Sequence, residues 1–390
     1  MRVIPPCPYF GTCGGCALQD LAYDEQLAVK RERLQRALAV LPELPEVTLE
    51  GLDDPWRYRN KAEFSFSEAD GRLILGYHAA RSFWRVIDLE DCLLLPEEAM
   101  RAVREVRDLA AETGLPAYHP KAHQGLFRHL IVRHSRATGR MLLCLVTAPG
   151  PRDIVERFAE RLMARRPSVA GVYWGVTDRL ADAAIPDTLS CIRGEEYLED
   201  RLGPFRVQLH PMSFLQANTV QADRLYRRMC ELLQGGPTRV AWDLYCGLGL
   251  VGLYLSSHVA RVYGIDCEPH HLALGQRNAE LNGVSNLEFR TGEVETLLSD
   301  RRFWLQEAKP DVVVVDPPRA GLHARALSSL VAARPAQIVY LSCNVHTLVR
   351  DLQTLLSSFP RYRLTAVHGF DMFPQTNHTE LLVHLGRRSR

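Results

Sequence analysis

Four short apolar runs, separated by helical stretches, limit the fold of this chain more than any other feature of its 390 residues. The runs lie at 239–244, 261–265, 311–315 and 337–341. Buried strands that alternate with helices are typical of a doubly wound, mostly parallel sheet. Such a sheet binds its ligands at the carboxyl ends of its strands. The sequence therefore predicts an α/β fold with a Rossmann-like domain over residues 206–390.

Residues 1–205 follow a different pattern, in which helices and strand-like runs do not alternate regularly. Helical spacing of apolar residues occurs at 24–41, 97–114 and 152–166, and strand-like stretches occur at 56–95, 128–148 and 169–176. We predict an α+β domain here, with a boundary near residue 205. Its first helix, 24–41, is free to pack on the second domain.

Composition and charge indicate an ordinary globular protein. Hydrophobic residues make up 46% of the chain, charged residues make up 24%, and the net charge is +1. No apolar run reaches the ~18–20 residues of a membrane helix, so we expect no membrane association. The first ten residues lack the apolar core of a secretory signal. We therefore expect a cytoplasmic protein, and we expect a monomer.

Basic residues beside aromatic residues predict a contact surface for RNA. The stretch WRYRNK holds Arg57, Arg59 and Lys61, and a second basic stretch without acids holds Arg128 and Arg133. Such side chains suit phosphate contact and base stacking. A pair of solvated strand faces would give the same pattern, so charge alone leaves both interpretations open.

The segment VAWDLYCGLGLVGLYL indicates a nucleotide-like cofactor. Gly247, Gly249 and Gly252 match the G-x-G-x-x-G pattern of dinucleotide sites, but Asp243 stands just before them at a strand end. A carboxylate there would repel the pyrophosphate of NAD. S-adenosylmethionine has no phosphate and carries an ammonium group, so the sequence favours it. Asp266, at the end of the next strand, is placed to accept the ribose hydroxyls of either cofactor.

Three further strand boundaries carry polar residues. Asp316 follows four valines and opens the motif DPPR, in which Arg319 suits a phosphate or a carbonyl, although a rigid turn would explain the prolines as well. Cys343 lies in the motif SCN and by itself is best interpreted as a small buried cysteine. Glu380 enters the last apolar run, where a carboxylate is costly unless it has a partner or a role.

Five motifs resemble, in this order, the RNA (uracil-5-)-methyltransferase family: FLQAN, DLYCGLG, DPPRAG, SCN and DMFPQTNHTE. The resemblance covers the chain from Cys7 to Glu380. It implies a class I methyltransferase fold and a reaction in which Cys343 adds to uracil C6 and Glu380 later removes the C5 proton. It assigns Gln216, Tyr245, Asp266 and Asp316 to the binding of S-adenosylmethionine or the positioning of uracil, beside Asp243, Gly247 and Gly249 of the glycine turn. The chain departs from the family at Leu250, where many members have Asn, and at Asp266, where Glu is usual.

The cysteines near the amino terminus predict an inorganic centre. Cys7, Cys13 and Cys16 form a C-x5-C-x2-C pattern, and Cys92 is the candidate for a fourth ligand. This spacing leaves zinc and an iron–sulfur cluster open. The resemblance implies a [4Fe-4S] cluster, which the ribosomal branch of the family carries and the bacterial tRNA branch generally lacks. We also expect no oligonucleotide-binding barrel (a TRAM domain) before Cys7.

The leading hypothesis is an enzyme that methylates C5 of a specific uridine in 23S ribosomal RNA. Within the family, the alternative substrate is the T-loop uridine of tRNA. A more distant alternative is an iron–sulfur, NAD-linked oxidoreductase, which Asp243 and the Cys343/Glu380 pair disfavour. A non-catalytic RNA-binding protein is the remaining alternative, and the presence of both a nucleophile and a base disfavours it.

Overall fold

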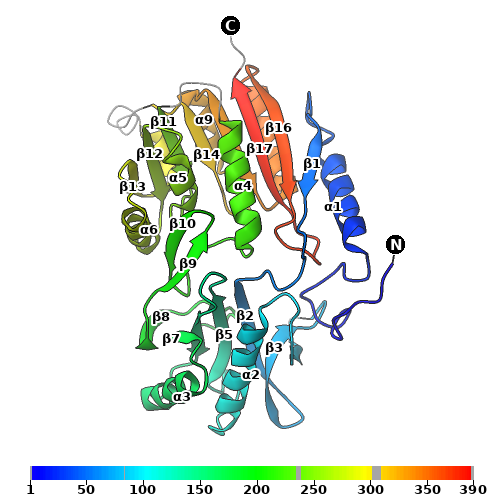
Figure 1. Cartoon of the computed structure of the whole chain (residues 1–390), viewed down its shortest axis with the longest axis vertical. Coiled ribbons are helices and arrows are strands. Elements are labelled where there is room, and N and C mark those ends of the chain that lie inside the picture. The colour runs from blue at the N-terminus through cyan, green and yellow to red at the C-terminus, as the bar shows by residue number, and fades with distance from the viewer. Residues whose placement is uncertain (1, 83, 234–238, 301–308, 388–390) are drawn as a thin grey trace.

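The computed structural model describes residues 2–82, 84–233, 239–300 and 309–387. Two sheets follow one another along the long axis of the molecule (Figure 1), with a two-stranded ribbon between them. The strand order is β1-β16-β17-β15-β14-β11-β12-β13 in the larger sheet and β4-β3-β2-β5-β6-β7-β8 in the smaller one. The ribbon consists of β9 (Leu198–Leu202) and β10 (Phe205–Leu209).

The larger sheet has the predicted alternation of strands and helices. Its strands are β1 (Val47–Glu50), β11 (Val240–Leu244), β12 (Arg261–Asp266), β13 (Leu287–Thr291), β14 (Val312–Val315), β15 (Gln337–Ser342), β16 (Tyr362–Phe370) and β17 (Glu380–Arg387). Its helices are α4 (Thr219–Leu232), α5 (Leu250–Leu255), α6 (Pro269–Leu281), α7 (Val294–Ser299), α9 (Ala324–Ala333) and α10 (Val345–Ser358). β13, β12, β11, β14 and β15 are parallel neighbours, and β17 runs antiparallel between β15 and β16. The predicted α/β, Rossmann-like fold is confirmed.

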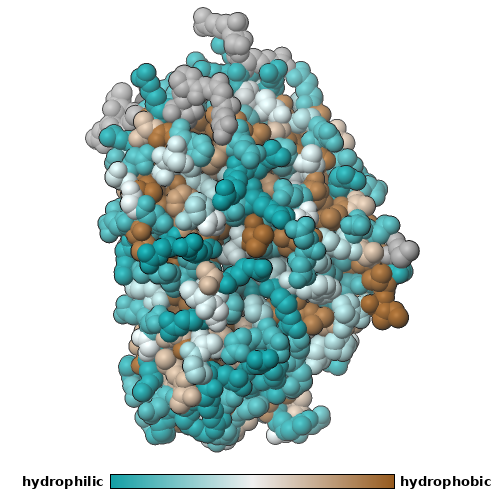
Figure 2. Space-filling model, in the orientation of Figure 1, coloured by the Kyte–Doolittle hydropathy of each residue, from teal (hydrophilic) through white to brown (hydrophobic). Residues whose placement is uncertain are grey.

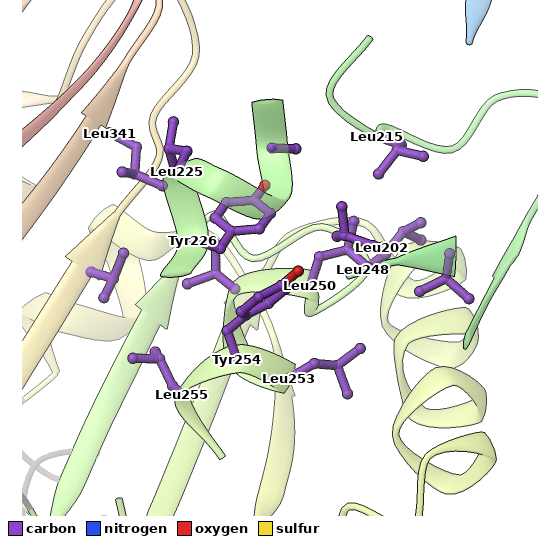
Figure 3. Packing of buried hydrophobic residues seen from close by; sticks show 14 of the residues in the cluster. Leu202, Leu215, Leu225, Tyr226, Leu248, Leu250, Leu253, Tyr254, Leu255 and Leu341 are labelled. Carbon is purple, nitrogen blue, oxygen red and sulfur yellow. The ribbon is translucent and has the colours of Figure 1, made fainter. Parts of the chain in front are cut away.

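Apolar side chains cover both faces of this sheet, which explains why its strands are continuous apolar runs. β14 consists of four buried valines, and its first and third residues belong to the core cluster on one face, its second and fourth to the cluster on the other. Figure 3 shows part of the first cluster. There Tyr226 of α4 packs against Tyr254 of α5, with ring centroids 5.2 Å apart.

The smaller sheet forms the first domain. Its strands are β2 (Lys61–Ala69), β3 (Arg72–His78), β4 (Val86–Asp88), β5 (Phe127–His134), β6 (Met141–Thr147), β7 (Val169–Val176) and β8 (Thr188–Gly194). The helices α2 (Glu97–Ala111) and α3 (Arg152–Arg165) pack against this sheet and contribute to a third core cluster. β5 and β6 are buried along their whole length. The region is α+β, as its sequence pattern predicts.

Two elements from the start of the chain lie with the larger sheet. β1 pairs in parallel with β16 at the sheet edge, and α1 (Tyr23–Leu38) packs against β1 and α10. The buried residues of α1 form one stripe at intervals of four: Gln26, Lys30, Leu34 and Leu38. The predicted helix 24–41 therefore packs on the second domain. Because α1 and β1 precede residue 205 but belong to the larger sheet, the second domain is built from two separate parts of the chain.

No helix in the described part of the chain is long and apolar enough to cross a membrane. The face of the molecule in Figure 2 is mostly hydrophilic, and its apolar side chains lie in small separate spots. Phe214 is one of the exposed apolar residues, with 60% of its surface accessible, two positions before Gln216.

Candidate active site

Four parallel strands end at one edge of the larger sheet, and the residues at these ends form the predicted site. Leu244 of β11 lies opposite both Val315 of β14 and Ile265 of β12, and Val315 lies opposite Tyr340 of β15. The strand ends are therefore neighbours in space. The site residues that they carry are Tyr245, Asp266, Asp316 and Cys343.

The glycine turn after β11 is held from two sides by carboxylates. Asp266 Oδ2 accepts a hydrogen bond from the Gly247 amide at 2.9 Å, and Asp243 Oδ2 accepts one from the Gly252 amide at 2.9 Å. Gly247 and Gly249 have φ values of +51° and +67°, which favour glycine. A Cβ added to Gly247 would meet no atom within 4 Å, so the turn borders open space at this point.

Asp243 has one carboxylate oxygen, Oδ1, that finds no hydrogen-bond partner among the described residues. The residue is fully buried, and burial raises its pKa well above the usual value, with the charges of Asp316 and Asp266 raising it further. A buried acceptor without a partner attracts a positively charged donor. Oδ1 is shielded from solvent, so the structure shows no contact surface for a cofactor at this atom, but a carboxyl behind the glycine turn still disfavours the pyrophosphate of NAD.

Tyr245 and Gln216 are each held by a contact with another segment. Tyr245 has a φ of +62°, and its hydroxyl donates to Glu295 Oε1 at 2.8 Å. Gln216 is buried, and its carbonyl accepts from Asn60 Nδ2 at 2.8 Å. Because Asn60 directly precedes β2, the first domain helps to position the segment that carries Gln216.

The antiparallel pairing of β15 with β17 brings the predicted nucleophile and the predicted base together. Ser342 lies opposite Leu381 in this pair. Cys343, which directly follows β15, therefore comes next to Glu380 at the start of β17, and the charge of Glu380 acts on the Cys343 thiol. Cys343 is half-buried, whereas Glu380 is only 2% exposed. A reactant bound between them could meet the thiol and the carboxyl at once.

Two carboxyls with restricted access to water share this site. Burial raises the pKa of Asp316 to about 7. Burial, followed by the charge of Asp316, raises the pKa of Glu380 well above its usual value. Because nearby carboxylates disfavour one another's ionisation, the pair retains a proton near neutral pH. Once ionised, a carboxylate of raised pKa is a strong proton acceptor.

Arg319 supplies a positive charge to the site. Burial raises the pKa of Cys343, and the charges of Glu380 and Asp316 raise it further, whereas Arg319 lowers it. Arg319 Nη2 lies 3.4 Å from His378 Nδ1, which links the DPPR turn to the loop before Glu380. Arg319 thus favours the thiolate form of Cys343, which is the nucleophilic one.

The motif SCN forms a hydrogen-bonded turn between β15 and α10. Ser342 Oγ accepts from the Asn344 amide at 3.1 Å. Asn344 caps α10 by accepting from the His346 amide at 3.1 Å, and its Nδ2 donates to the Arg319 carbonyl at 3.1 Å. The small polar residues around Cys343 therefore end the strand, start the helix and hold the neighbouring turn.

Tyr226 of α4 is a core residue near this site that the sequence analysis did not single out. The residue is 3% exposed, and burial raises its pKa, with further contributions from the charges of Asp316, Glu380 and Asp243. Its hydroxyl therefore lies within electrostatic reach of all three carboxyls. Tyr226 lies on the apolar face of an amphipathic helix, so its position in the sequence predicts a core residue and nothing more.

The four predicted metal ligands, Cys7, Cys13, Cys16 and Cys92, line one pocket in the first domain. Burial raises the pKa of the last three thiols, in the case of Cys16 to about 12, and neighbouring thiols of the set raise it further. Within residues 2–82, 84–233, 239–300 and 309–387, no three His, Cys, Asp or Glu side chains are gathered as one metal ion would require. The structure brings the four cysteines to one pocket without forming a single-ion site.

Arg57, Arg59 and Lys61, which were predicted to contact RNA, have partners or neighbours within the first domain. Arg57 donates to both oxygens of Asp91, at 2.9 and 2.6 Å, and Lys61 pairs with Glu63 at 2.8 Å. Arg59 lines the cysteine pocket. All three residues keep some exposure, so phosphate contact stays a prediction for them.

Arg128 and Arg133 do not fit the predicted phosphate contact, because they are only 2% and 0% exposed. Arg128 donates to three backbone carbonyls of residues 177–181, and Arg133 donates to two carbonyls of residues 211–213. The reason is that β5, which carries both, is buried along its whole length. Their charges hold loops rather than face solvent.

Comparisons with known proteins agree with this geometry. The family described as tRNA (uracil-5-)-methyltransferase matches residues 194–388. An uncharacterised RNA methyltransferase of Halalkalibacterium halodurans is 35% identical over 382 residues, which cover 97% of this chain and 82% of the relative. A second one, from Nitratidesulfovibrio vulgaris, is 35% identical over 396 residues, which cover 98% and 83% of the two chains.

A solved structure resembles the whole fold. The Pyrococcus abyssi tRNA (uracil-54, C5)-methyltransferase, in complex with S-adenosyl-L-homocysteine, has a TM-score of 0.77 and 28% sequence identity. The match covers 95% of this chain and 85% of that one, so it includes both sheets. The residues at the carboxyl ends of the strands, the similar relatives and the shared fold lead to one conclusion. The chain is an RNA methyltransferase and belongs to the RNA (uracil-5-)-methyltransferase family.

Proposed function

We propose that this enzyme transfers a methyl group from S-adenosylmethionine to C5 of a specific uridine in 23S ribosomal RNA. The observation that carries the proposal is the pairing of β15 with β17, which makes Cys343 and Glu380 neighbours at the edge that also holds the glycine turn. A thiol and a base around one planar ring are the two groups that methylation of a pyrimidine carbon requires.

Covalent catalysis makes the weakly nucleophilic C5 reactive. The Cys343 thiolate adds to C6, and the electron pair of the C5–C6 double bond becomes available at C5. C5 then attacks the methyl carbon of the sulfonium, and S-adenosylhomocysteine leaves. The Glu380 carboxylate takes the C5 proton, the double bond forms again, and the Cys343 sulfur leaves as a thiolate.

S-adenosylmethionine as the methyl donor is supported by the open space at Gly247 and by Asp243, which holds the glycine turn and disfavours a cofactor with a pyrophosphate. Asp266 accepts amide hydrogens from Gly247 and Glu268, one on each oxygen, and each oxygen keeps a lone pair for a ribose hydroxyl. The related P. abyssi enzyme binds S-adenosyl-L-homocysteine, the product of the same donor. We assign Gln216, Tyr245 and Asp316 to the remaining contacts with the donor or with uracil.

Two RNA classes compete as substrates. The set of four cysteines favours ribosomal RNA, because the chain resembles the ribosomal branch in this feature. The similarity to the P. abyssi tRNA (uracil-54, C5)-methyltransferase favours tRNA. For RNA contact we retain Arg57, Arg59 and Lys61, which are not fully buried.

We further propose that Cys7, Cys13, Cys16 and Cys92 hold a [4Fe-4S] cluster. The four cysteines fit such a cluster because their thiols line one pocket. In a [4Fe-4S] cubane each thiolate binds a different iron, so the four sulfurs need not converge on a single metal ion. Burial raises the pKa of Cys92, and the nearby charge of Arg59 opposes that rise. Such a cluster would fix the segments that carry its ligands, and methyl transfer itself requires no electron from it.

Incubation with a labelled methyl donor should decide between the two RNA classes. We expect label in unmodified 23S rRNA transcripts and not in unmodified tRNA transcripts when the two are mixed, treated with the enzyme and separated by size. The Cys343→Ala variant is the control and should label neither. Label in the tRNA fraction alone would replace the ribosomal assignment with the tRNA alternative.

The mutants of Cys343 and Glu380 should fail at different steps. Cys343→Ala should bind RNA and form no covalent adduct. Glu380→Gln keeps the shape but cannot take the C5 proton, so a methylated protein–RNA adduct should accumulate and survive a denaturing gel. The band should require both the methyl donor and Cys343. Methylation by Cys343→Ala at a rate near that of the wild type would contradict the assignment.

Two glycines with similar backbones test the donor site. Gly247→Ala and Gly139→Ala both force a non-glycine residue to a positive φ with open space around Cβ, so each should lose about 1–2 kcal/mol of folding stability. Only Gly247→Ala should weaken binding of S-adenosylmethionine, because its added methyl group would occupy space that the donor needs. The expected loss of binding free energy is about 1–3 kcal/mol, which is an affinity about 5- to 150-fold weaker. Calorimetry measures the binding and thermal unfolding the stability. Equal donor affinity in the two variants would remove the glycine turn from the donor site.

Metal content should depend on Cys92 and not on Cys191, which lies in β8 outside the cysteine pocket. Protein purified without oxygen should be brown and hold about four irons per chain if a cubane is bound. Cys92→Ser should lose this iron, and Cys191→Ser should keep it. Stoichiometric zinc without iron in the wild type would show that the cysteines serve a different centre.

A further inference from the structure

The loop between β16 and β17, which we call the base loop (residues 371–379), leads directly to Glu380. It contains no strand or helix of its own, so its shape depends on contacts with other segments. The described residues provide no hydrogen bond to the Glu380 carboxyl, and the position of that carboxyl therefore depends on its backbone. That backbone is set by the pairing of Glu380 with Phe370 at the start of β17 and by the base loop before it.

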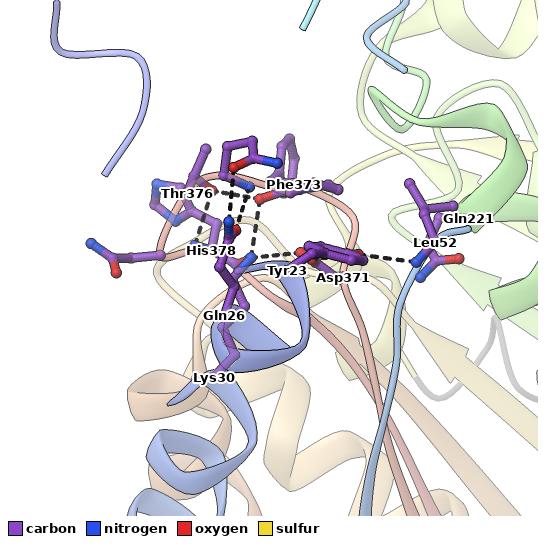
Figure 4. A network of polar contacts seen from close by, with 12 residues as sticks. Tyr23, Gln26, Lys30, Leu52, Gln221, Asp371, Phe373, Thr376 and His378 are labelled. Carbon is purple, nitrogen blue, oxygen red and sulfur yellow. Dashed lines mark hydrogen bonds and ion pairs between the residues drawn. The ribbon is translucent and has the colours of Figure 1, made fainter. Parts of the chain in front are cut away.

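Helix α1 holds both ends of the base loop through one side chain (Figure 4). Lys30 Nζ donates to Asp371 Oδ1 at 2.6 Å. It also donates to the carbonyls of Phe373 and His378, at 3.1 Å each. The three acceptors span the loop from its first residue to the second residue before Glu380. The ammonium group of Lys30 thus connects the two ends of the base loop.

The Lys30–Asp371 pair is fully buried, and both side chains are 0% exposed. Burial lowers the pKa of Lys30 and raises that of Asp371, while each charge opposes the shift of the other. A buried ion pair is seldom more stabilising than apolar side chains of the same volume. The next two positions of the buried stripe, Leu34 and Leu38, are apolar. An apolar residue at position 30 would serve packing as well, so the charge points to a geometric role.

The middle of the base loop is held by the same amino-terminal segment. Gln26 Nε2 donates to Gln375 Oε1 at 2.9 Å, and the Gln375 amide donates to Gln26 Oε1 at 3.1 Å. The Gln375 carbonyl accepts the amides of Ala17 and Leu18, at 2.9 and 3.0 Å. Gln375 has a φ of +70°, which a non-glycine residue keeps only where its surroundings impose it.

We propose that Lys30 is a positioning residue for the proton-abstraction step, an inference that rests on the function proposed above. Lys30 bonds to the base loop and fixes it, so that Glu380 is within reach of the C5 proton after methyl transfer. Cys343 follows β15, outside the base loop, so addition to C6 and methyl transfer do not require the Lys30 contacts. The consequence is a selective defect: loss of Lys30 should slow the last step and not the first two.

The test compares two rates in the same assay, with S-adenosylmethionine and the RNA transcript that the wild type methylates. Formation of the methylated protein–RNA adduct reports the early steps, and release of 5-methyluridine-containing RNA reports proton abstraction. In Lys30→Met we expect release to slow about 10- to 100-fold, which is the effect of displacing a catalytic group by about 1 Å. Adduct formation should stay close to wild type, so the methylated adduct accumulates as it does in Glu380→Gln.

Lys30→Met leaves Asp371 buried without its partner, which can prevent folding. The double variant Lys30→Met/Asp371→Asn removes both charges and keeps similar volumes, and it should show the same accumulation of adduct. Tyr362→Phe is the matched control. It removes a buried hydrogen bond from Tyr362 to the Pro335 carbonyl at 2.6 Å. Tyr362 is the first residue of β16, the strand whose other end leads into the base loop. The variant should leave the ratio of adduct to released RNA unchanged.

The outcomes separate this inference from the proposed function. If a folded Lys30 variant slows adduct formation and release equally, or changes neither, Lys30 has only a structural role and the inference is wrong. The same conclusion holds if Tyr362→Phe accumulates the adduct as strongly. If the wild type forms no covalent complex with RNA that contains 5-fluorouridine and no methylated product, the proposed function itself fails.

Discussion

The insertion of β17 between β15 and β16 is the constraint on which the proposed active site depends. Antiparallel pairing with β15 makes Glu380 and Cys343 neighbours, although 36 residues separate them along the chain. A slip of one residue would turn the Glu380 side chain to the other face of the sheet. Residues 380–385 are all buried, with Leu381, Val383 and Leu385 in the core cluster on one face and Leu382 in the cluster on the other, so apolar packing opposes such a slip.

This arrangement concentrates negative charge in a place with little water. Asp243, Asp316 and Glu380 all have raised pKa values, and the hydroxyl of Tyr226 lies within reach of their charges. Buried carboxyls reduce folding stability unless they are paired. In the function proposed above, one of these carboxyls, Glu380, takes the C5 proton of the substrate, so their effect on stability would serve the reaction.

The first domain and the amino-terminal segment take part in the site through backbone contacts. Asn60 holds the carbonyl of Gln216, and Arg133 holds the loop just before that residue. The residues directly after Cys16 bond to Gln375 in the base loop. The cysteine pocket and the loop that leads to Glu380 are therefore connected by a short covalent and hydrogen-bonded path.

The sequence by itself determined the parts of this protein that local patterns encode. Four apolar runs predicted the central strands, the glycines with Asp243 predicted the turn, and the resemblance of five motifs to a known family implied Cys343 and Glu380 as a pair. The helix predicted at 24–41 also followed from periodicity, whereas the sequence left its contact with the second domain only as an option. These features were accessible because hydrophobic period, glycine conformation and short motifs depend on residues close together in the chain.

Tertiary structure alone decided which side chains meet across long separations. Arg128 and Arg133 have the composition of an RNA-contacting stretch, but β5 became a central strand and buried both. Tyr226 and Lys30 lie on buried helix faces, and no local pattern shows that Lys30 meets a buried carboxylate there instead of apolar side chains. The pairing of Lys30 with Asp371 joins residues 341 positions apart. Such contacts arise from strand order and helix packing, which no short stretch of sequence specifies.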